Sequence, residues 1–262
     1  MTSTTSAERR FTAVAELLFV ASVAGTIGWC AAMPDVPMPM PGGWAMSMAW
    51  MRMPGQTWPG AVASFLGMWI VMMVAMMLPA LVPMLRRYRQ AVGRPGQAGL
   101  GRLTALVGAG YFAVWTLFGM AAFPLGIALA AIEMQQPALS RAVPFAVAAI
   151  VIAAGLLQFT AWKARCLACC REAPGRLGAR PADAGAAWRH GLRLGLRCSR
   201  CCAALMAVLL VVGIMDLRAM VVVAAAINVE RLAPGGERVA RATGAVVVAA
   251  GLLLIARRAG LG

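Results

Sequence analysis

Six of the seven cysteines in this sequence fall into two groups that share the spacing Cys-x-x-Cys-Cys. The groups are Cys166, Cys169 and Cys170, and Cys198, Cys201 and Cys202. On a helix, positions i, i+3 and i+4 lie on one face, so each group is predicted to present its three sulfurs in one direction. If the two segments pair as a hairpin, the two sulfur faces meet.

Cysteines grouped in this way indicate a metal site. Thiolates are soft ligands that suit Cu(I), zinc and iron–sulfur clusters. The Cys-x-x-Cys part of each group resembles a zinc or iron–sulfur framework, but adjacent cysteines are unusual in a structural zinc site. Cu(I) is therefore the expected metal, with zinc and iron as alternatives. The competing interpretation, that small cysteines only pack helix ends, is disfavoured by the repeated pattern.

Methionines supply a second soft ligand, the thioether. Five of them lie on one predicted helix, over about residues 60–85: Met68, Met72, Met73, Met76 and Met77. At about 100° per residue they form a stripe over about half of the helix circumference. Such a stripe can pass a soft cation along the helix. Flexible methionine also fills gaps between helices, and both interpretations stay open.

The segment over residues 33–58 combines seven methionines with five prolines and is predicted to be an extracytoplasmic loop. Proline prevents a long helix there. Its only charged residues are Asp35 and Arg52, so it lacks the arginine excess of a cytoplasmic loop. Its methionines can collect a soft metal or rest on lipid, and the composition supports both interpretations equally.

The composition predicts an all-α, polytopic membrane protein. Of the 262 residues, 61% are hydrophobic and only 13% are charged, which is more apolar surface than a soluble domain of this size buries. The net charge of +15 comes almost entirely from arginines between apolar runs, so it indicates membrane topology rather than nucleic-acid binding. The lipid bilayer is an expected partner, and residues 1–262 are predicted to form one integral membrane domain.

Seven transmembrane helices are predicted, and six is the alternative count. They cover approximately residues 11–32, 60–85, 103–132, 143–162, 198–215, 217–231 and 242–256. The N-terminus is predicted to be cytoplasmic, because Arg9 and Arg10 precede an apolar run that is long for a cleaved signal peptide. Pro79 and Pro83 are expected to kink or end the second helix.

A turn is predicted over residues 213–217. Without it, Asp216 and Arg218 would lie near the middle of one span, where each charge costs about 2.5–3.5 kcal/mol. One long tilted helix with an Asp216–Arg218 pair is the alternative. Arg257 and Arg258 at the C-terminus favour the six-helix topology.

Residues 163–202 are predicted to form a cytoplasmic, cysteine-rich hairpin loop, because arginines dominate its middle. Cysteines in a reducing compartment remain free thiols, available as metal ligands. His190 is the only histidine in the chain and is expected to be a solvated loop residue rather than a ligand. Glu230 is expected to pair with Arg231 or with a neighbouring helix end.

Several ordered segments carry a resemblance to a bacterial family. They are the run 68–79, Lys163 with Cys166 and Cys170, Cys198 with Cys201 and Cys202, the turn 213–216, and Glu230 with Arg231. Over about residues 60–235 the chain resembles the predicted metal-binding integral membrane proteins, a domain of unknown function sometimes labelled copper chaperone. The resemblance implies membrane location and metal binding. This chain has Cys169, Asp216 and Arg231 where histidine, asparagine and lysine are usual, and the first difference shifts the ligand set toward sulfur.

These features predict a protein of the bacterial inner membrane that binds a soft metal, with Cu(I) favoured, and that buffers it or delivers it to a membrane cuproprotein or another metal acceptor. A membrane thiol–disulfide oxidoreductase, and a structural subunit with a metal-stabilised hairpin, are the alternatives. The sequence has no phosphate-binding glycine loop and few ionisable residues within its helices, which disfavours driven transport. One histidine and few acids leave no hydrolytic triad, so no catalytic residues are predicted.

Overall fold

The computed structural model describes residues 2–32, 38–40, 44–46, 50, 52, 55–92, 99–171 and 183–258. These residues are almost entirely helical, which confirms the all-α class. The helices are α1 (Thr2–Ala32), α2 (Trp58–Val92), α3 (Leu100–Gln135), α4 (Pro137–Leu157), α5 (Ala161–Arg171), α6 (Ala184–Val212), α7 (Leu217–Leu232) and α8 (Gly236–Arg258). Strands β1 (Met38–Met40) and β2 (Trp44–Met46) form a small antiparallel hairpin that the sequence did not predict.

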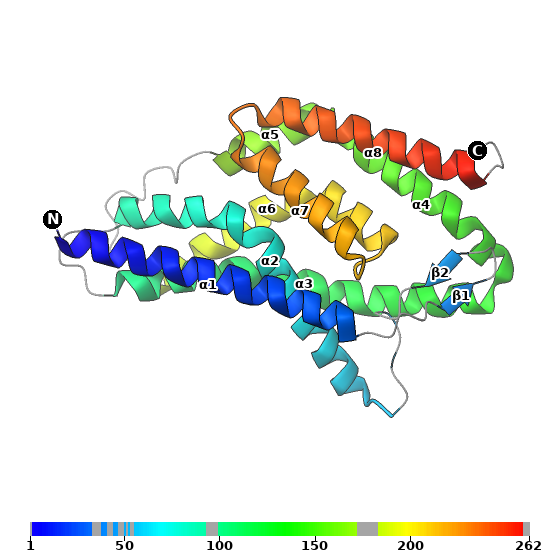
Figure 1. Ribbon diagram of the computed structural model, residues 1–262, viewed down its shortest axis with the longest axis horizontal. Coiled ribbons are helices and arrows are strands. Elements are labelled where there is room, and N and C mark those ends of the chain that lie inside the picture. Colours follow the sequence, from blue (N-terminus) through cyan, green and yellow to red (C-terminus); the bar gives the residue numbers. More distant parts are fainter. Residues whose placement is uncertain are drawn as a thin grey trace.

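Within the described residues, six helices are long and apolar enough to cross a membrane: α1 from Ser6 onward, α2, α3, α4, α6 and α8. Helix α7 has 16 residues and rises about 24 Å, less than the roughly 30 Å of a bilayer core. All seven predicted helices therefore exist, but only six of them have the length of a span. Figure 1 shows the start of α1 and the end of α8 at opposite ends of the bundle.

The helices pack in two groups with α6 and α7 between them (Figure 1). Helices α1, α2 and α3 form one group, and α4 and α8 form an antiparallel pair on the other side. Helix α3 packs along α6, and α7 contacts α2, α6 and α8. The most buried side chains belong to α2, α3, α6 and α7, so the core lies where these four helices meet.

The prolines of α2 bend the helix without ending it. Pro79 and Pro83 lie inside α2, which continues to Val92, so the expectation of an end near Leu85 is wrong. Figure 1 shows α2 changing direction along its length. Proline disrupts the backbone hydrogen bonds of the preceding turn. Asn228 of α7 donates to the Met76 carbonyl at 2.8 Å in that turn, which stabilises the bend.

The predicted turn between the fifth and sixth segments is confirmed. Helix α6 ends at Val212, and Gly213 follows with a φ of 141°, a conformation that favours glycine. Asp216 caps α7: its side chain accepts hydrogen bonds from the backbone N–H groups of Arg218 at 2.8 Å and Ala219 at 3.1 Å. The alternative of one long helix with an Asp216–Arg218 ion pair is therefore wrong.

The prediction of a loop over residues 163–202 is wrong for most of its length. The first cysteine group lies on α5, and residues 184–197 form the first half of α6. Asp183 caps this half by accepting from the Ala186 N–H at 2.6 Å. Its arginines are exposed, whereas Ala187, Gly191 and Gly195 are buried along one face. This spacing of four residues makes an amphipathic helix, which the arginine content concealed.

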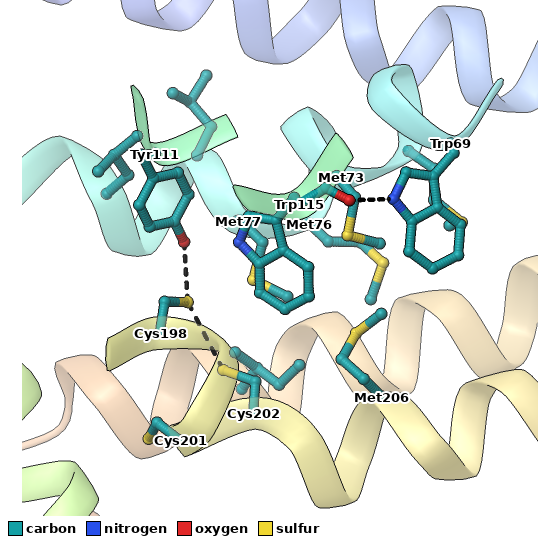
Figure 2. Close-up of a cluster of buried hydrophobic side chains, with 14 of the residues drawn as sticks. Trp69, Met73, Met76, Met77, Tyr111, Trp115, Cys198, Cys201, Cys202 and Met206 are labelled. Atoms are coloured by element: carbon teal, nitrogen blue, oxygen red, sulfur yellow. Dashed lines mark hydrogen bonds between the residues drawn. The ribbon is translucent and has the colours of Figure 1, made fainter. Parts of the chain in front are cut away.

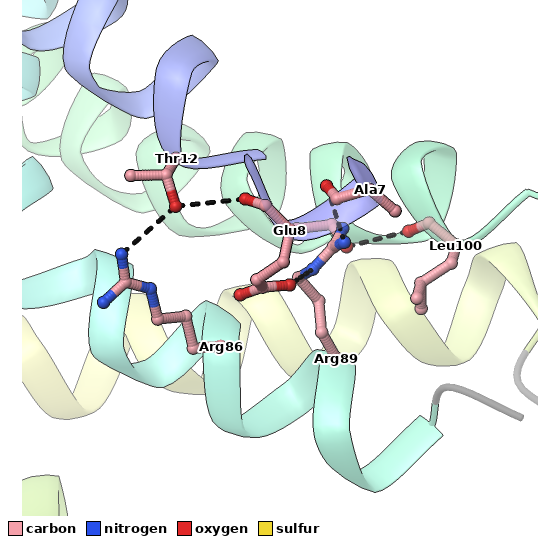
Figure 3. A network of polar contacts seen from close by, with 7 residues as sticks. Ala7, Glu8, Thr12, Arg86, Arg89 and Leu100 are labelled. Carbon is pink, nitrogen blue, oxygen red and sulfur yellow. Dashed lines mark hydrogen bonds and ion pairs between the residues drawn. The ribbon is translucent and has the colours of Figure 1, made fainter. Parts of the chain in front are cut away.

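Arg89 fixes the start of α1 to the end of α2 (Figure 3). Its Nε lies 3.3 Å from Glu8 Oε2, and its Nη2 donates to the Ala7 carbonyl at 3.5 Å. Its Nη1 donates to Thr104 Oγ1 on α3 at 3.4 Å, and its guanidinium lies 4.7 Å from the Phe11 ring centroid. One arginine thus joins three helices at the end of the bundle that carries the N-terminus.

Candidate metal centre

Glycines bring α3 and α6 into close contact beside the second cysteine group. A Cβ atom on Gly110 would lie 2.6 Å from the Trp188 carbonyl oxygen, and one on Gly191 would overlap the Val107 carbonyl. Because the backbones approach this closely, Tyr111 of α3 reaches α6 and its hydroxyl donates to Cys198 Sγ at 2.9 Å (Figure 2).

All three cysteines of the second group are buried. Cys198 and Cys202 are one helical turn apart, and their Sγ atoms are 3.8 Å apart. Cys201 lies on the side of α6 that faces α5, where it contacts Cys170. All three sulfurs are therefore buried, but Cys201 faces α5 whereas Cys198 lies against Tyr111 of α3.

The first cysteine group does not present three sulfurs in one direction. Cys170 is buried, Cys166 is half-buried and Cys169 is exposed. A hydrogen bond to Cys201, together with burial, raises the pKa of the Cys170 thiol, which also lies 3.5 Å from the Arg197 carbonyl. Burial also raises the pKa of Cys166. Only the edge of this sulfur face meets α6, because fewer helices surround α5 than surround α6.

The structure therefore gathers four sulfurs from two helices, here called the sulfur cluster: Cys170, Cys198, Cys201 and Cys202. Within the described ranges, no three cysteine, histidine or acidic side chains stand close enough to hold a metal ion together. A site that needs several strong ligands in a fixed arrangement, such as structural zinc, does not fit these positions. Cu(I) fits the donor set better, because it is bound by thiolates and thioethers.

Methionine thioethers lie directly beside the sulfur cluster. All five methionines of the predicted stripe are buried, with Met73 and Met77 fully enclosed. Figure 2 shows Met73, Met76 and Met77 between the Trp69 and Trp115 rings and the side chains of α6. Met206 of α6 faces them, and it was not among the predicted ligands. Soft donors from α2 and α6 thus line one continuous buried region.

Aromatic rings close the far end of the methionine stripe. The Phe65 ring packs against Phe123 at 4.7 Å, Trp50 at 5.5 Å and Trp69 at 5.8 Å between centroids. Trp69 is fixed by its indole N–H, which donates to the Trp115 carbonyl at 2.8 Å. Rings from α2 and α3, together with Trp50, therefore pack against the end of the stripe.

Three of the seven methionines in the 33–58 segment lie within the described residues. Met40 packs with Ala130 and Trp44 in a separate small cluster, away from the stripe. Trp44 donates its indole N–H to the Ser140 carbonyl at 3.0 Å, which holds the hairpin near the junction of α3 and α4. Four of the segment's methionines lie outside the described residues: Met33, Met48, Met51 and Met53.

A buried ion pair lies next to the sulfur cluster. Lys163 Nζ is 2.7 Å from Glu230 Oε2 and donates to the Cys201 carbonyl at 2.8 Å. Gln158 Nε2 donates to Glu230 Oε1 at 3.1 Å. Burial raises the pKa of Glu230, and the charge of Lys163 opposes that rise. Glu230 was expected to pair with Arg231 or with a neighbouring helix end. The first alternative is wrong and the second is correct, because the partner Lys163 lies in the first turn of α5.

The structure also differs from the predictions at His190 and Tyr111. His190 lies on α6, half-buried, with its ring 5.3 Å from that of Tyr88, so the expectation of a solvated loop residue is wrong. Tyr111 was not predicted as part of the site. A single tyrosine in an apolar helix, with a hydroxyl that needs a partner, was the signal that could have indicated it.

Comparison with known proteins gives a family match. The family model described as PpoB2: Copper chaperone matches residues 66–254, which include the methionine stripe and both cysteine groups. No curated protein matches, and no solved structure matches.

Proposed function

The chain belongs to this copper chaperone family, and on that premise we propose that it binds Cu(I) within the membrane and delivers it to a membrane cuproprotein or another metal acceptor. The sulfur cluster holds the ion, and the methionine stripe relays it. The observation that carries the proposal is the meeting of four cysteines from α5 and α6 beside the buried thioethers of α2. Thiolates and thioethers are the ligands that select Cu(I).

We propose a location in the bacterial inner membrane with a cytoplasmic N-terminus. Six apolar helices support insertion in a bilayer. Arginines are concentrated at the end of the bundle that holds the start of α1, the end of α2, α5 and the start of α6, which supports a cytoplasmic position for that end. The sulfur cluster then lies near the cytoplasmic side and the hairpin near the opposite side.

Removal of the sulfur cluster tests the proposal. We expect detergent-purified wild-type protein to bind Cu(I) under reducing conditions. Replacing Cys170, Cys198, Cys201 and Cys202 by serine is expected to weaken Cu(I) binding by about 100-fold, because a hydroxyl is a poor ligand for a soft ion. Competition with a chromophoric Cu(I) chelator measures the affinity, and elemental analysis identifies the metal that co-purifies.

A variant with Cys30, Cys166 and Cys169 replaced by serine is the matched control and is expected to keep its copper, since these three lie outside the sulfur cluster. Zinc or iron in place of copper would reject the copper assignment. Absence of any metal from reduced wild-type protein would reject the proposed function.

The relay by the methionine stripe makes a separate prediction. We expect the double replacement Met73→Leu and Met77→Leu to slow the appearance of Cu(I)–thiolate absorption by about tenfold after rapid mixing, because the thioether route to the cysteines is interrupted. The free energy of unfolding should change by less than about 1.5 kcal/mol per site, since leucine conserves volume. The exposed Met120, replaced by leucine, is the control, and equal rates in all three proteins would contradict a relay.

A further inference from the structure

Arg231 is a buried charge whose hydrogen-bond partners are sulfur atoms. It lies in the last turn of α7 and is 6% exposed. Its Nη1 donates to Cys198 Sγ at 2.9 Å, and its Nη2 donates to Met84 Sδ on α2 at 3.4 Å. Its buried Nε has no hydrogen-bond partner within the described residues. One guanidinium thus joins a cysteine sulfur and a thioether sulfur from two different helices.

These contacts stabilise the guanidinium poorly. A buried cation needs a counter-charge and a partner for each N–H group. In the part of the chain that the structure describes, Arg231 forms no ion pair with a carboxylate. The Met84 thioether is a weak acceptor. Packing stability alone therefore does not explain a cation at this position.

The same two sulfurs form a ligand pair for a soft cation. A cysteine sulfur and a thioether are the donors that select Cu(I), and both already face a positive charge. We propose that, in the metal-free protein, the Arg231 guanidinium occupies the position between Cys198 and Met84 that Cu(I) takes on loading, so that the two cations exchange at one site. This inference rests on the proposed copper function and adds Met84 to its ligands.

The exchange conserves charge and needs no redox partner. One monovalent cation replaces another, and two positive charges cannot share this water-poor region without strong repulsion. Tyr111 supplies the second donor to Cys198, so the sulfur keeps its position while the long arginine side chain moves. When Cu(I) leaves, the guanidinium returns and restores the positive charge beside the two sulfurs. This return favours release of the ion to an acceptor.

The rate of metal release tests this exchange. Full-length protein in detergent is loaded with Cu(I) and mixed with an excess of the chelator bathocuproine disulfonate. Arg231→Met is expected to slow release by about tenfold, because the hydrogen bond from Arg231 to Cys198 can no longer re-form as Cu(I) leaves. Met84→Leu is expected to speed release by about tenfold, because a ligand is lost. Arg238→Met removes an exposed charge on α8 and is expected to release Cu(I) at the wild-type rate.

Release from Arg231→Met that is as fast as from wild type, or faster, would overturn the exchange. An unchanged rate in Met84→Leu would remove Met84 from the site and overturn the proposal in this form. Arg231→Gln provides the same comparison if the methionine variant does not fold. Failure of the wild type to take up Cu(I) is a different result, and it would reject the proposed function itself.

Discussion

Replacing Glu230 by glutamine is expected to lower the free energy of unfolding by about 3–5 kcal/mol, because it leaves the buried ammonium of Lys163 without a counter-charge. Both side chains are almost fully enclosed, and their ion pair is 2.7 Å long. Lys163 also donates to the Cys201 carbonyl, so the loss should loosen α5 from α6. Unfolding in mixed detergent micelles, followed by circular dichroism, measures the change.

Two further variants isolate the cause. Glu237→Gln removes an exposed carboxylate from the first turn of α8 and is expected to cost less than about 1 kcal/mol. The double replacement Lys163→Met with Glu230→Leu removes both charges and is expected to recover most of the lost stability, since an apolar pair of similar volume replaces the ion pair. Equal stability of Glu230→Gln and Glu237→Gln would show that the ion pair is not a major stabilising contact.

Replacing Gly191 by alanine is expected to destabilise the protein by about 3 kcal/mol, even though alanine is the better helix former. A Cβ atom there would overlap the Val107 carbonyl of α3, and a backbone atom cannot move aside as a flexible side chain does. Separation of α3 from α6 would also lengthen the Tyr111–Cys198 hydrogen bond, so Cu(I) affinity should fall together with stability.

Gly108→Ala is the matched control on the facing helix. A Cβ atom on Gly108 meets nothing within 4 Å, so this change is expected to stabilise the protein by about 0.5–1 kcal/mol through helix propensity. The two glycine variants should therefore shift the unfolding midpoint in opposite directions. A shift of the same sign and size in both would contradict the close α3–α6 contact.

Local features of the sequence determined the helical segments. Apolar runs of spanning length predicted seven helices, and the cost of charges in lipid predicted the turn at Gly213 and Asp216. Two predictions failed where a local rule was incomplete. Arginines suggested a loop before Cys198, whereas the spacing of Ala187, Gly191 and Gly195 builds an amphipathic helix there. Prolines suggested an end to α2, whereas a hydrogen bond from α7 supports its bend.

The sequence shows which side chains are candidate sulfur ligands, but it does not show which of them are buried together. Spacing within each group is the same, yet Cys198, Cys201 and Cys202 are buried while Cys169 is exposed. The difference arises because α6 lies between α3, α5 and α7, whereas α5 meets its neighbours along one edge. Burial of a helix face depends on which other helices surround it. The eleven residues of α5 do not contain that information.

By itself, the sequence determined the helical class, the existence of seven of the helices, and the soft-donor chemistry of cysteine and methionine. These properties depend on hydropathy, helical periodicity and the cost of buried charge, which act within one segment. Only the tertiary structure decided that Lys163 pairs with Glu230, that Cys170 joins the second cysteine group, and that Arg231 lies between Cys198 and Met84. Those contacts join residues far apart in the chain, and close packing of α2, α5, α6 and α7 is what brings them together.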